Sequence, residues 1–361
     1  MEKWSFEMKK RKVNAQQLIS FALLALTLVI VLYIGFSDND IEDLAGALKN
    51  LTPAYLLLCL LSRLLYVFFD ALAIHHFLRS QGQKIKFLET FHSAIIGIYY
   101  CNVTPGASGG QPMQMYCLSK YKVPIGISGS GLAVKFVVFQ AVLLITGAVM
   151  WLLHAPFVNQ RIEGTTWFVL LGYLANFFTI GMVMMMAISQ RAVRWVIEKC
   201  IRIGVKLRIC KDPDASRAKW ENHCQSFLGS VQMLMKRPLD VIVQCVIAFL
   251  QLMSLMLVIL AVYHALGLSG ESTSQLITMG VLLYIGASYV PTPGASGAQE
   301  GGFASIFRTI FPDAHLFVAL LIWRFSTYYL TVLVGAVFTT IENILSLQKA
   351  NHAEKKAEAE N

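Results

Sequence analysis

An eight-residue motif rich in proline, glycine and hydroxyl side chains occurs twice in the chain. Residues 104–111 read TPGASGGQ and residues 292–299 read TPGASGAQ, so seven of eight positions agree across a separation of 188 residues. Proline fits the first turn of a helix, glycine permits tight turns, and hydroxyl groups can cap a helix end. A helix that begins at such a motif directs unpaired N–H groups and a partial positive charge outward, which suits an anion such as a lipid phosphate.

The polar and glycine positions of both copies are therefore candidate substrate-binding residues. They are Thr104, Gly106, Ser108, Gly109 and Gln111 in the first copy, and Thr292, Gly294, Ser296, Gly297 and Gln299 in the second. The alternative is a packing kink, because glycine also lets membrane helices approach closely. A single copy would favour the kink, whereas repetition in two halves of the chain favours a binding site.

Three charged residues extend the candidate site. Lys135 follows Gly106 by 29 residues and Arg324 follows Gly294 by 30, so the duplication places a cation at nearly equivalent points of both halves. Charges at membrane depth are costly and are usually functional or paired. Glu300 directly follows the second copy. Three roles are open for it: holding a cationic head group, binding a coupling proton, or neutralising Arg324.

Arg63 and Asp70 are two further charges inside an apolar segment. They are seven residues apart, hence on roughly one helix face, and they can pair with each other or with Lys135. Lys135 lies only eleven residues into its own apolar segment, so its side chain can alternatively extend to the cytoplasmic interface.

The composition is that of a membrane protein with several spans. Of 361 residues, 56% are hydrophobic and 14% are charged, against about 25% charged in soluble domains. The net charge of +9 is typical of basic cytoplasmic loops in such a protein, so we do not expect a nucleic-acid partner. The seven cysteines include no Cys-x-x-Cys pair, and no P-loop, zinc site or hydrolytic triad is recognisable, so we expect no metal, cofactor or catalytic residue.

Long apolar segments predict an all-α fold of membrane-spanning helices. Six segments are long enough to cross, namely 17–36, 53–78, 124–153, 165–189, 239–264 and 315–342. The first follows a basic stretch and lacks a small-residue cleavage site, so we expect an uncleaved span. Two further stretches, 88–120 and 273–311, contain the octapeptides and are too interrupted for one straight helix.

The distribution of lysine and arginine predicts the orientation of the spans. It places the N-terminus (1–16), the strongly basic loop 190–237 and the tail 343–361 in the cytoplasm. Both ends of 88–120 then lie on the cytoplasmic side and both ends of 273–311 outside, as in re-entrant hairpins. The alternative is that each stretch forms two short crossing helices.

With hairpins, the single domain 17–342 contains an inverted repeat of halves 53–153 and 239–342. In transporters of this plan, broken helices bring their ends together near the bilayer midplane.

At these motifs the chain resembles the lysylphosphatidylglycerol synthase transmembrane region, or flippase-like domain, which is the membrane half of the multiple peptide resistance factors. The resemblance is carried by Thr104–Tyr116 with Leu118 and Ser119, and by Pro291–Gly302, and extends over nearly the whole chain. It implies a bacterial cell-membrane protein of lipid metabolism and antibiotic resistance. Its role would be moving an anionic or aminoacylated phospholipid, such as lysyl-phosphatidylglycerol, between leaflets.

Full-length members of this family add a soluble domain that transfers the amino acid from tRNA. Only 19 residues, 343–361, follow the last predicted span, so we expect that domain to be absent and the chain not to be the enzyme. The main alternative is aminoacyl-phospholipid synthesis, alone or as the membrane partner of a separate transferase. A third reading is a secondary transporter of a small anion. The sequence leaves the oligomeric state open.

Overall fold

The structure is a computed structural model that describes residues 51–188 and 236–341, shorter stretches at 46–49 and 228–234, and a few single positions. These residues form helices and connecting turns, with no strand among them, which confirms the predicted all-α fold. The predicted first span 17–36 lies outside the described residues apart from Val29, as does the tail 343–361. Most of the basic loop 190–237 also lies outside them.

In the described part of the chain, five helical segments are long and apolar enough to cross a membrane. They are α3 (Pro53–Ser80), α6 (Ile125–Leu153), α8 (Thr166–Ile188), α11 (Pro238–Ala265) and His315–Ile341, which includes most of α14 (Asp313–Arg324). A short helix, α7 (Ala155–Arg161), connects α6 to α8. The five segments agree closely with the predicted spans, so the protein is a multi-pass membrane protein.

Helices α3 and α11 form a central antiparallel pair. The backbone N–H of Thr52 donates to the carbonyl oxygen of Ala265 at 3.0 Å, and at the opposite end Arg237 donates to the carbonyl oxygen of Ser80 at 3.2 Å. These are the first long helices of the two predicted repeat halves. Their antiparallel packing is what opposite orientation of the halves requires, while the inverted symmetry itself remains a prediction.

The first interrupted stretch folds into a helical hairpin. Helix α4 (Phe87–Val103) leads to a 3-10 turn, η1 (Pro105–Ala107), and α5 (Gly110–Lys120) packs back against α4. Gly110 permits the close approach at the tip, because a Cβ there would lie 2.0 Å from the sulfur of Cys101.

The second stretch repeats this arrangement. Helix α12 (Thr273–Ala287) leads to η2 (Pro293–Ala295), and α13 (Ala298–Phe307) packs back against α12. A Cβ at Gly302 would lie 2.8 Å from the side chain of Leu283. Both stretches are thus two helices joined by an octapeptide turn; whether they re-enter or cross the bilayer remains a prediction.

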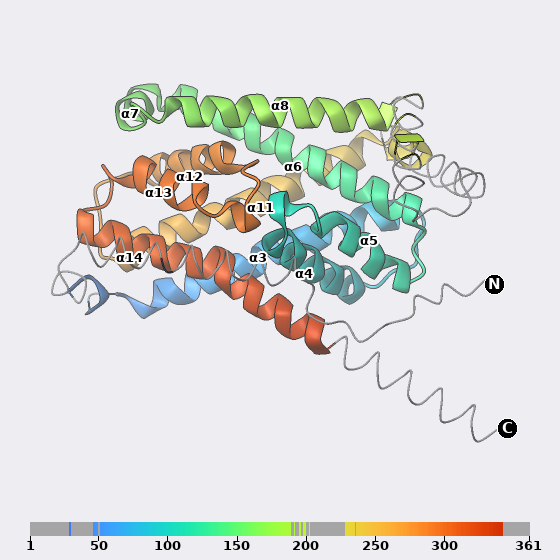
Figure 1. Ribbon diagram of the computed structural model, residues 1–361, viewed down its shortest axis with the longest axis horizontal. Helices are drawn as coiled ribbons and strands as arrows, with labels where there is room; N and C mark the ends of the chain where they lie inside the picture. Colours follow the sequence, from blue (N-terminus) through green and yellow to red (C-terminus); the bar gives the residue numbers. More distant parts are fainter. Residues whose placement is uncertain are drawn as a thin grey trace, which may run out of the picture.

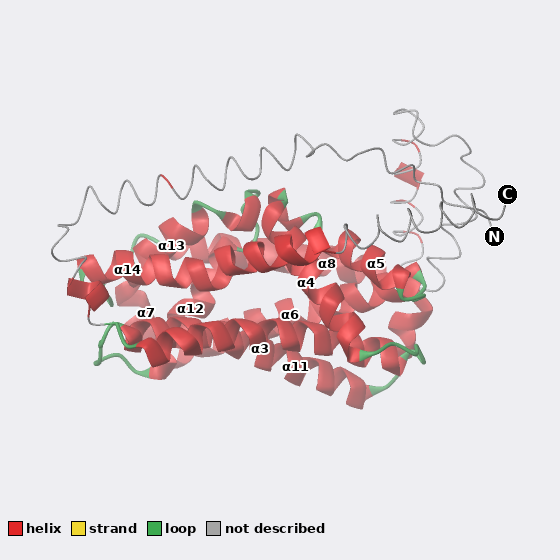
Figure 2. Cartoon of the chain, turned by 90° about the horizontal axis from the view of Figure 1, so that it is seen from below, coloured by secondary structure: helices red, strands yellow, loops and turns green. Residues whose placement is uncertain are grey.

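The two hairpin tips meet. Turns η1 and η2 are in contact, and Figure 1 shows them side by side near the middle of the long axis of the bundle. Figure 2 shows loops at the two ends of the bundle and at one place midway along it. The hydroxyl oxygen of Tyr328 lies 3.2 Å from the carbonyl oxygen of Asn102 and 3.5 Å from that of Pro293, so it bridges the two hairpins.

Both octapeptides adopt the same backbone turn. Gly106 has φ 59° and ψ 28°, and Gly294 has φ 59° and ψ 25°. The alanines that follow, Ala107 and Ala295, are also left-handed, with φ of 55° and 51°. Non-glycine residues rarely adopt this region, so its occurrence in both copies shows that the local sequence determines the turn.

The two copies diverge from the next residue onward, because Ser108 has ψ −25° and Ser296 has ψ 142°. Gly109 has φ −84°, whereas Gly297 has φ 91°, a conformation that strongly favours glycine. The second hairpin is also packed more deeply in the hydrophobic core, where the ring of Phe303 stacks between Phe307 (centroids 4.6 Å apart) and Trp323 (4.9 Å).

We expect alanine to be tolerated differently at the two equivalent tip glycines. Gly106→Ala adds only left-handed backbone strain, about 1–2 kcal/mol, because no atom lies within 4 Å of the added Cβ. Gly294→Ala adds the same strain and a clash, since its Cβ would lie 2.0 Å from the ring of Tyr328, so a further ~1–3 kcal/mol is expected. Thermal unfolding of both purified variants measures the difference, and equal destabilisation would contradict the described packing.

Candidate functional site

A buried ion pair joins the second octapeptide to the last spanning segment. Both Nε and Nη2 of Arg324 lie 2.7 Å from Oε1 of Glu300, and the two residues are only 5% and 7% exposed. The other carboxylate oxygen, Oε2, accepts a hydrogen bond from the backbone N–H of Gly297 at 2.6 Å. Glu300 therefore neutralises Arg324 and caps the N-terminus of α13 with the same side chain.

The guanidinium of Arg324 also holds the octapeptide turn directly. It donates to the hydroxyl oxygen of Ser296 at 3.1 Å and lies 3.4 Å from the carbonyl oxygen of Gly294. On its other side it lies 4.5 Å from the ring centroid of Tyr328. Of the three roles open for Glu300, the pair with Arg324 is present in this structure; contact with a head group or a coupling proton remains a prediction.

Local helix geometry helps to place these side chains. Directly after Arg324 the helix widens into a π turn, η3 (Phe325–Tyr329). Such turns are rare and occur often at functional sites. Tyr328 lies on this turn, where its ring contacts the guanidinium of Arg324 and fills the space beside Gly294.

Lys135 makes a second, partly buried ion pair, with partners that lie outside the first octapeptide. Its Nζ lies 2.9 and 2.8 Å from the two carboxylate oxygens of Asp70 on α3, and 3.4 Å from Oε1 of Gln114. The amide of Gln251 on α11 also donates to Asp70 at 3.1 Å. Lys135 therefore points into the bundle, and Asp70 pairs with it rather than with Arg63.

The first octapeptide is held without a charged side chain. Oγ1 of Thr104 accepts a hydrogen bond from the backbone N–H of Gly109 at 2.9 Å, while Ser108 and Gln111 are exposed. Lys135 occurs one residue earlier relative to its octapeptide than Arg324 does, and one residue turns a helix by about 100°. Lys135 and Arg324 thus occupy nearly the same position in the sequence repeat, but their side chains leave their helices in different directions.

Polar atoms without partners gather on the elements around the tips. Of the five such fully enclosed atoms in the described part of the chain, Nε2 of Gln81 lies at the end of α3, and the other four are Nδ2 of Asn102, Nε2 of Gln114, Oε1 of Gln299 and Nε1 of Trp323. The hydroxyl of Thr292, by contrast, has a partner, because it donates to the carbonyl oxygen of Ser296 at 2.8 Å. Enclosed polar groups that lack a partner are costly, so these four are candidates to bind water or a ligand.

Arg63 is a buried cation whose only hydrogen bond in the described structure joins its Nε to the hydroxyl of Thr331 at 3.1 Å. It is 8% exposed, and its guanidinium carbon lies 4.5 Å from the ring centroid of Tyr66. No carboxylate of the described residues lies within ion-pair distance of it. Thr331 lies on the spanning segment that also carries Arg324, so Arg63 contacts the same segment.

Sequence reasoning missed several polar side chains that complete these contacts. Gln114 and Gln251 bind the Lys135–Asp70 pair, and Gln140 on α6 donates to Asn176 at 2.7 Å and to Tyr289 at 2.8 Å. Gln140 and Gln251 interrupt otherwise apolar segments, which is the signal that could have identified them, whereas Gln114 lies on the more polar α5 and has no such signal. Within the described ranges, no three His, Cys, Asp or Glu side chains gather as a metal site.

We expect the Lys135–Asp70 pair to behave as a coupled unit. Asp70→Asn alone leaves the partly buried Lys135 without a counter-charge and should cost about 3 kcal/mol of stability, whereas adding Lys135→Met should restore much of it. A double-mutant cycle on unfolding of the purified protein measures this coupling. Additive effects of the two substitutions would show that the pair is not energetically coupled.

A search of curated proteins found no match to this chain. A comparison with protein families did: residues 17–335 match the family described as the lysylphosphatidylglycerol synthase TM region. The match includes both hairpins, the Arg324–Glu300 and Lys135–Asp70 ion pairs and all five membrane-crossing segments up to residue 335. The chain therefore belongs to the lysylphosphatidylglycerol synthase TM region family.

Proposed function

We propose that this protein moves a phospholipid between the leaflets of the membrane, with the polar head group passing the two hairpin tips. The observation that carries this proposal is the meeting of the tips midway along the long helices, with charged side chains buried beside them. Membership of the lysylphosphatidylglycerol synthase TM region family supports a lipid as the substrate.

The middle of the bilayer is where a lipid head group is hardest to accommodate, because hydrocarbon offers it no hydrogen bonds. The tips supply such groups at that depth. The first tip exposes Gly106, Ser108 and Gln111, and the second adds Gln299 with its enclosed, unpartnered amide oxygen. A head group that contacts these residues would replace its hydrogen bonds to water with hydrogen bonds to the protein.

The interior charges suit a lipid that carries a phosphate. Arg63, Lys135 and Arg324 are cations, whereas Asp70 and Glu300 are the carboxylates that pair with the last two. Arg63 lacks a carboxylate partner in the described structure, so a phosphate can bind it without breaking an existing pair. Burying an unpaired charge is costly, and a bound anion would offset that cost.

The Arg324–Glu300 pair suits a head group with both signs of charge. A phosphate would replace Glu300 beside Arg324, and an amine would replace Arg324 beside Glu300, so each buried charge keeps a counter-charge. This exchange fits an aminoacylated phosphatidylglycerol as well as its anionic parent. An aminoacylated lipid would come from a separate synthase.

Reconstituted vesicles test the proposal through the transbilayer movement of fluorescent phosphatidylglycerol. Wild-type protein should accelerate exchange between leaflets, and the double variant Arg324→Ala/Glu300→Gln should lower the rate about tenfold or more, because it removes charge-assisted contacts. Both partners are changed together because either single change leaves a buried charge unpaired.

A matched control is the ion pair of Arg161 and Glu271, whose atoms are 2.7 Å apart at the α7 end of the bundle (Figure 1). The double variant Arg161→Ala/Glu271→Gln should leave the exchange rate near that of the wild type. Wild-type vesicles with no faster exchange than protein-free vesicles would reject the proposed function. Equal loss in both double variants would reject the role of the tip pair.

Arg63 should determine preference for an anionic head group. Arg63→Gln should lower the transbilayer exchange rate of phosphatidylglycerol about tenfold, because one charge-assisted contact to phosphate contributes about 1.5–3 kcal/mol. The exchange rate of a lipid without net charge should change much less. Arg63→Lys should retain most of the preference. The ratio of the two lipids' exchange rates measures this effect, and an unchanged ratio in Arg63→Gln would contradict it.

A further inference from the structure

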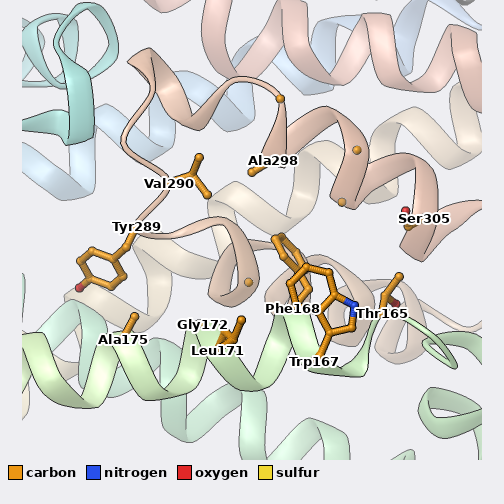
Figure 3. Close-up of a pocket in the computed structure, with 14 residues that line it drawn as sticks. Thr165, Trp167, Phe168, Leu171, Gly172, Ala175, Tyr289, Val290, Ala298 and Ser305 are labelled. Carbon is orange, nitrogen blue, oxygen red and sulfur yellow. The ribbon is translucent and has the colours of Figure 1, made fainter.

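A groove of about 530 Å³ follows helix α8, where α8 faces α12, the second tip and α13. Figure 3 shows Trp167, Phe168 and Leu171 along one wall, with Val290 and Ala298 opposite. The residues of α8 and its N-terminal flank that line it run from Thr165 to Ala175, ten positions apart. At 1.5 Å per residue this is roughly 15 Å, or about half the hydrocarbon thickness of a bilayer.

The groove opens on a face that meets lipid. Helix α8 is the least buried of the five membrane-crossing segments of the described chain, with 17% of its apolar window enclosed. Trp167 and Leu171 on the groove wall and Leu174 beside it are exposed. A narrow apolar space that is open sideways to the bilayer is filled by hydrocarbon, since water would find almost no partners there.

Two glycines keep the groove open without being needed for packing. Gly297 and Gly301 line it, and no atom of another residue lies within 4 Å of a Cβ added at either position. On the opposite wall, by contrast, Gly172 is needed for close packing, because a Cβ there would lie 2.1 Å from the backbone oxygen of Ile285. A large side chain at residue 297 or 301 would therefore take up space at the wall of the groove.

The groove and the buried ion pair share the first turn of α13. Gly297 lines the groove, and its N–H donates to Glu300, whose other oxygen binds Arg324. We propose that the groove holds one acyl chain of a phospholipid whose head group lies at the second tip. The nature of that head group rests on the proposed function; the acyl-chain site itself rests on the groove.

Covalent labelling tests the site independently of transport. The full chain, reconstituted in vesicles, is irradiated with a phosphatidylglycerol that carries a diazirine in one acyl chain, and the labelled peptides are identified by mass spectrometry. We expect labels on 165–175 and 297–305. Gly301→Leu should fill the groove and lower labelling of these peptides at least fivefold.

The matched control is Gly181→Leu on α8, the helix that forms the opposite wall of the groove. Gly181 is exposed, has no atom within 4 Å of an added Cβ and does not line the groove, so labelling should remain at the wild-type level. If Gly301→Leu does not fold, Ser305→Phe at the other end of the groove replaces it.

The outcomes separate the two proposals. Groove labelling that Gly301→Leu removes supports the acyl-chain site even if wild-type vesicles show no lipid exchange, which would reject only the proposed function. Labels spread evenly over all lipid-facing helices, or groove labelling unchanged by Gly301→Leu, would overturn the acyl-chain site even if exchange is fast.

Discussion

The structure depends on satisfying the backbone where two helices break inside an apolar bundle, because hydrocarbon offers no hydrogen bonds to the freed groups. At the second tip one ion pair does this: Arg324 approaches the carbonyl oxygen of Gly294, and Glu300 accepts from the N–H of Gly297. At the first tip the hydroxyl of Thr104 accepts from the N–H of Gly109. The backbone of the turn is thus hydrogen-bonded by charged side chains in the second half and by a neutral hydroxyl group in the first.

This difference makes the two halves unequal. The second tip is fixed by Arg324, Tyr328 and a deep aromatic core, whereas residues 105–108 of the first tip are exposed. Local opening requires the fewest broken contacts where packing is sparse. The first tip is therefore held by fewer packing contacts than the second.

Much of the fold could be predicted from sequence, because span length and the two octapeptides are local signals. The five long segments and the two-helix form of both interrupted stretches were predicted closely. Both observed ion pairs, Asp70 with Lys135 and Glu300 with Arg324, were among the alternatives that the sequence left open, but the choice between alternatives depends on helix rotation, which the sequence does not give. Lys135 and Arg324 differ by one residue in repeat position, and Lys135 pairs with Asp70 on α3 rather than with its own octapeptide. The π turn after Arg324 also has no pattern in the sequence that we recognised.

The first turn of α13 connects the two kinds of chemistry that a phospholipid requires. Its polar side caps the helix through Glu300 and binds Arg324, while its glycine side forms a wall of the apolar groove. Gly297 belongs to both, because its left-handed φ of 91° presents its N–H to Glu300 and its missing side chain leaves the groove open. An ordinary L residue there would strain the turn and occupy the groove together. Gly297 therefore lies between the proposed head-group site and the proposed acyl-chain site.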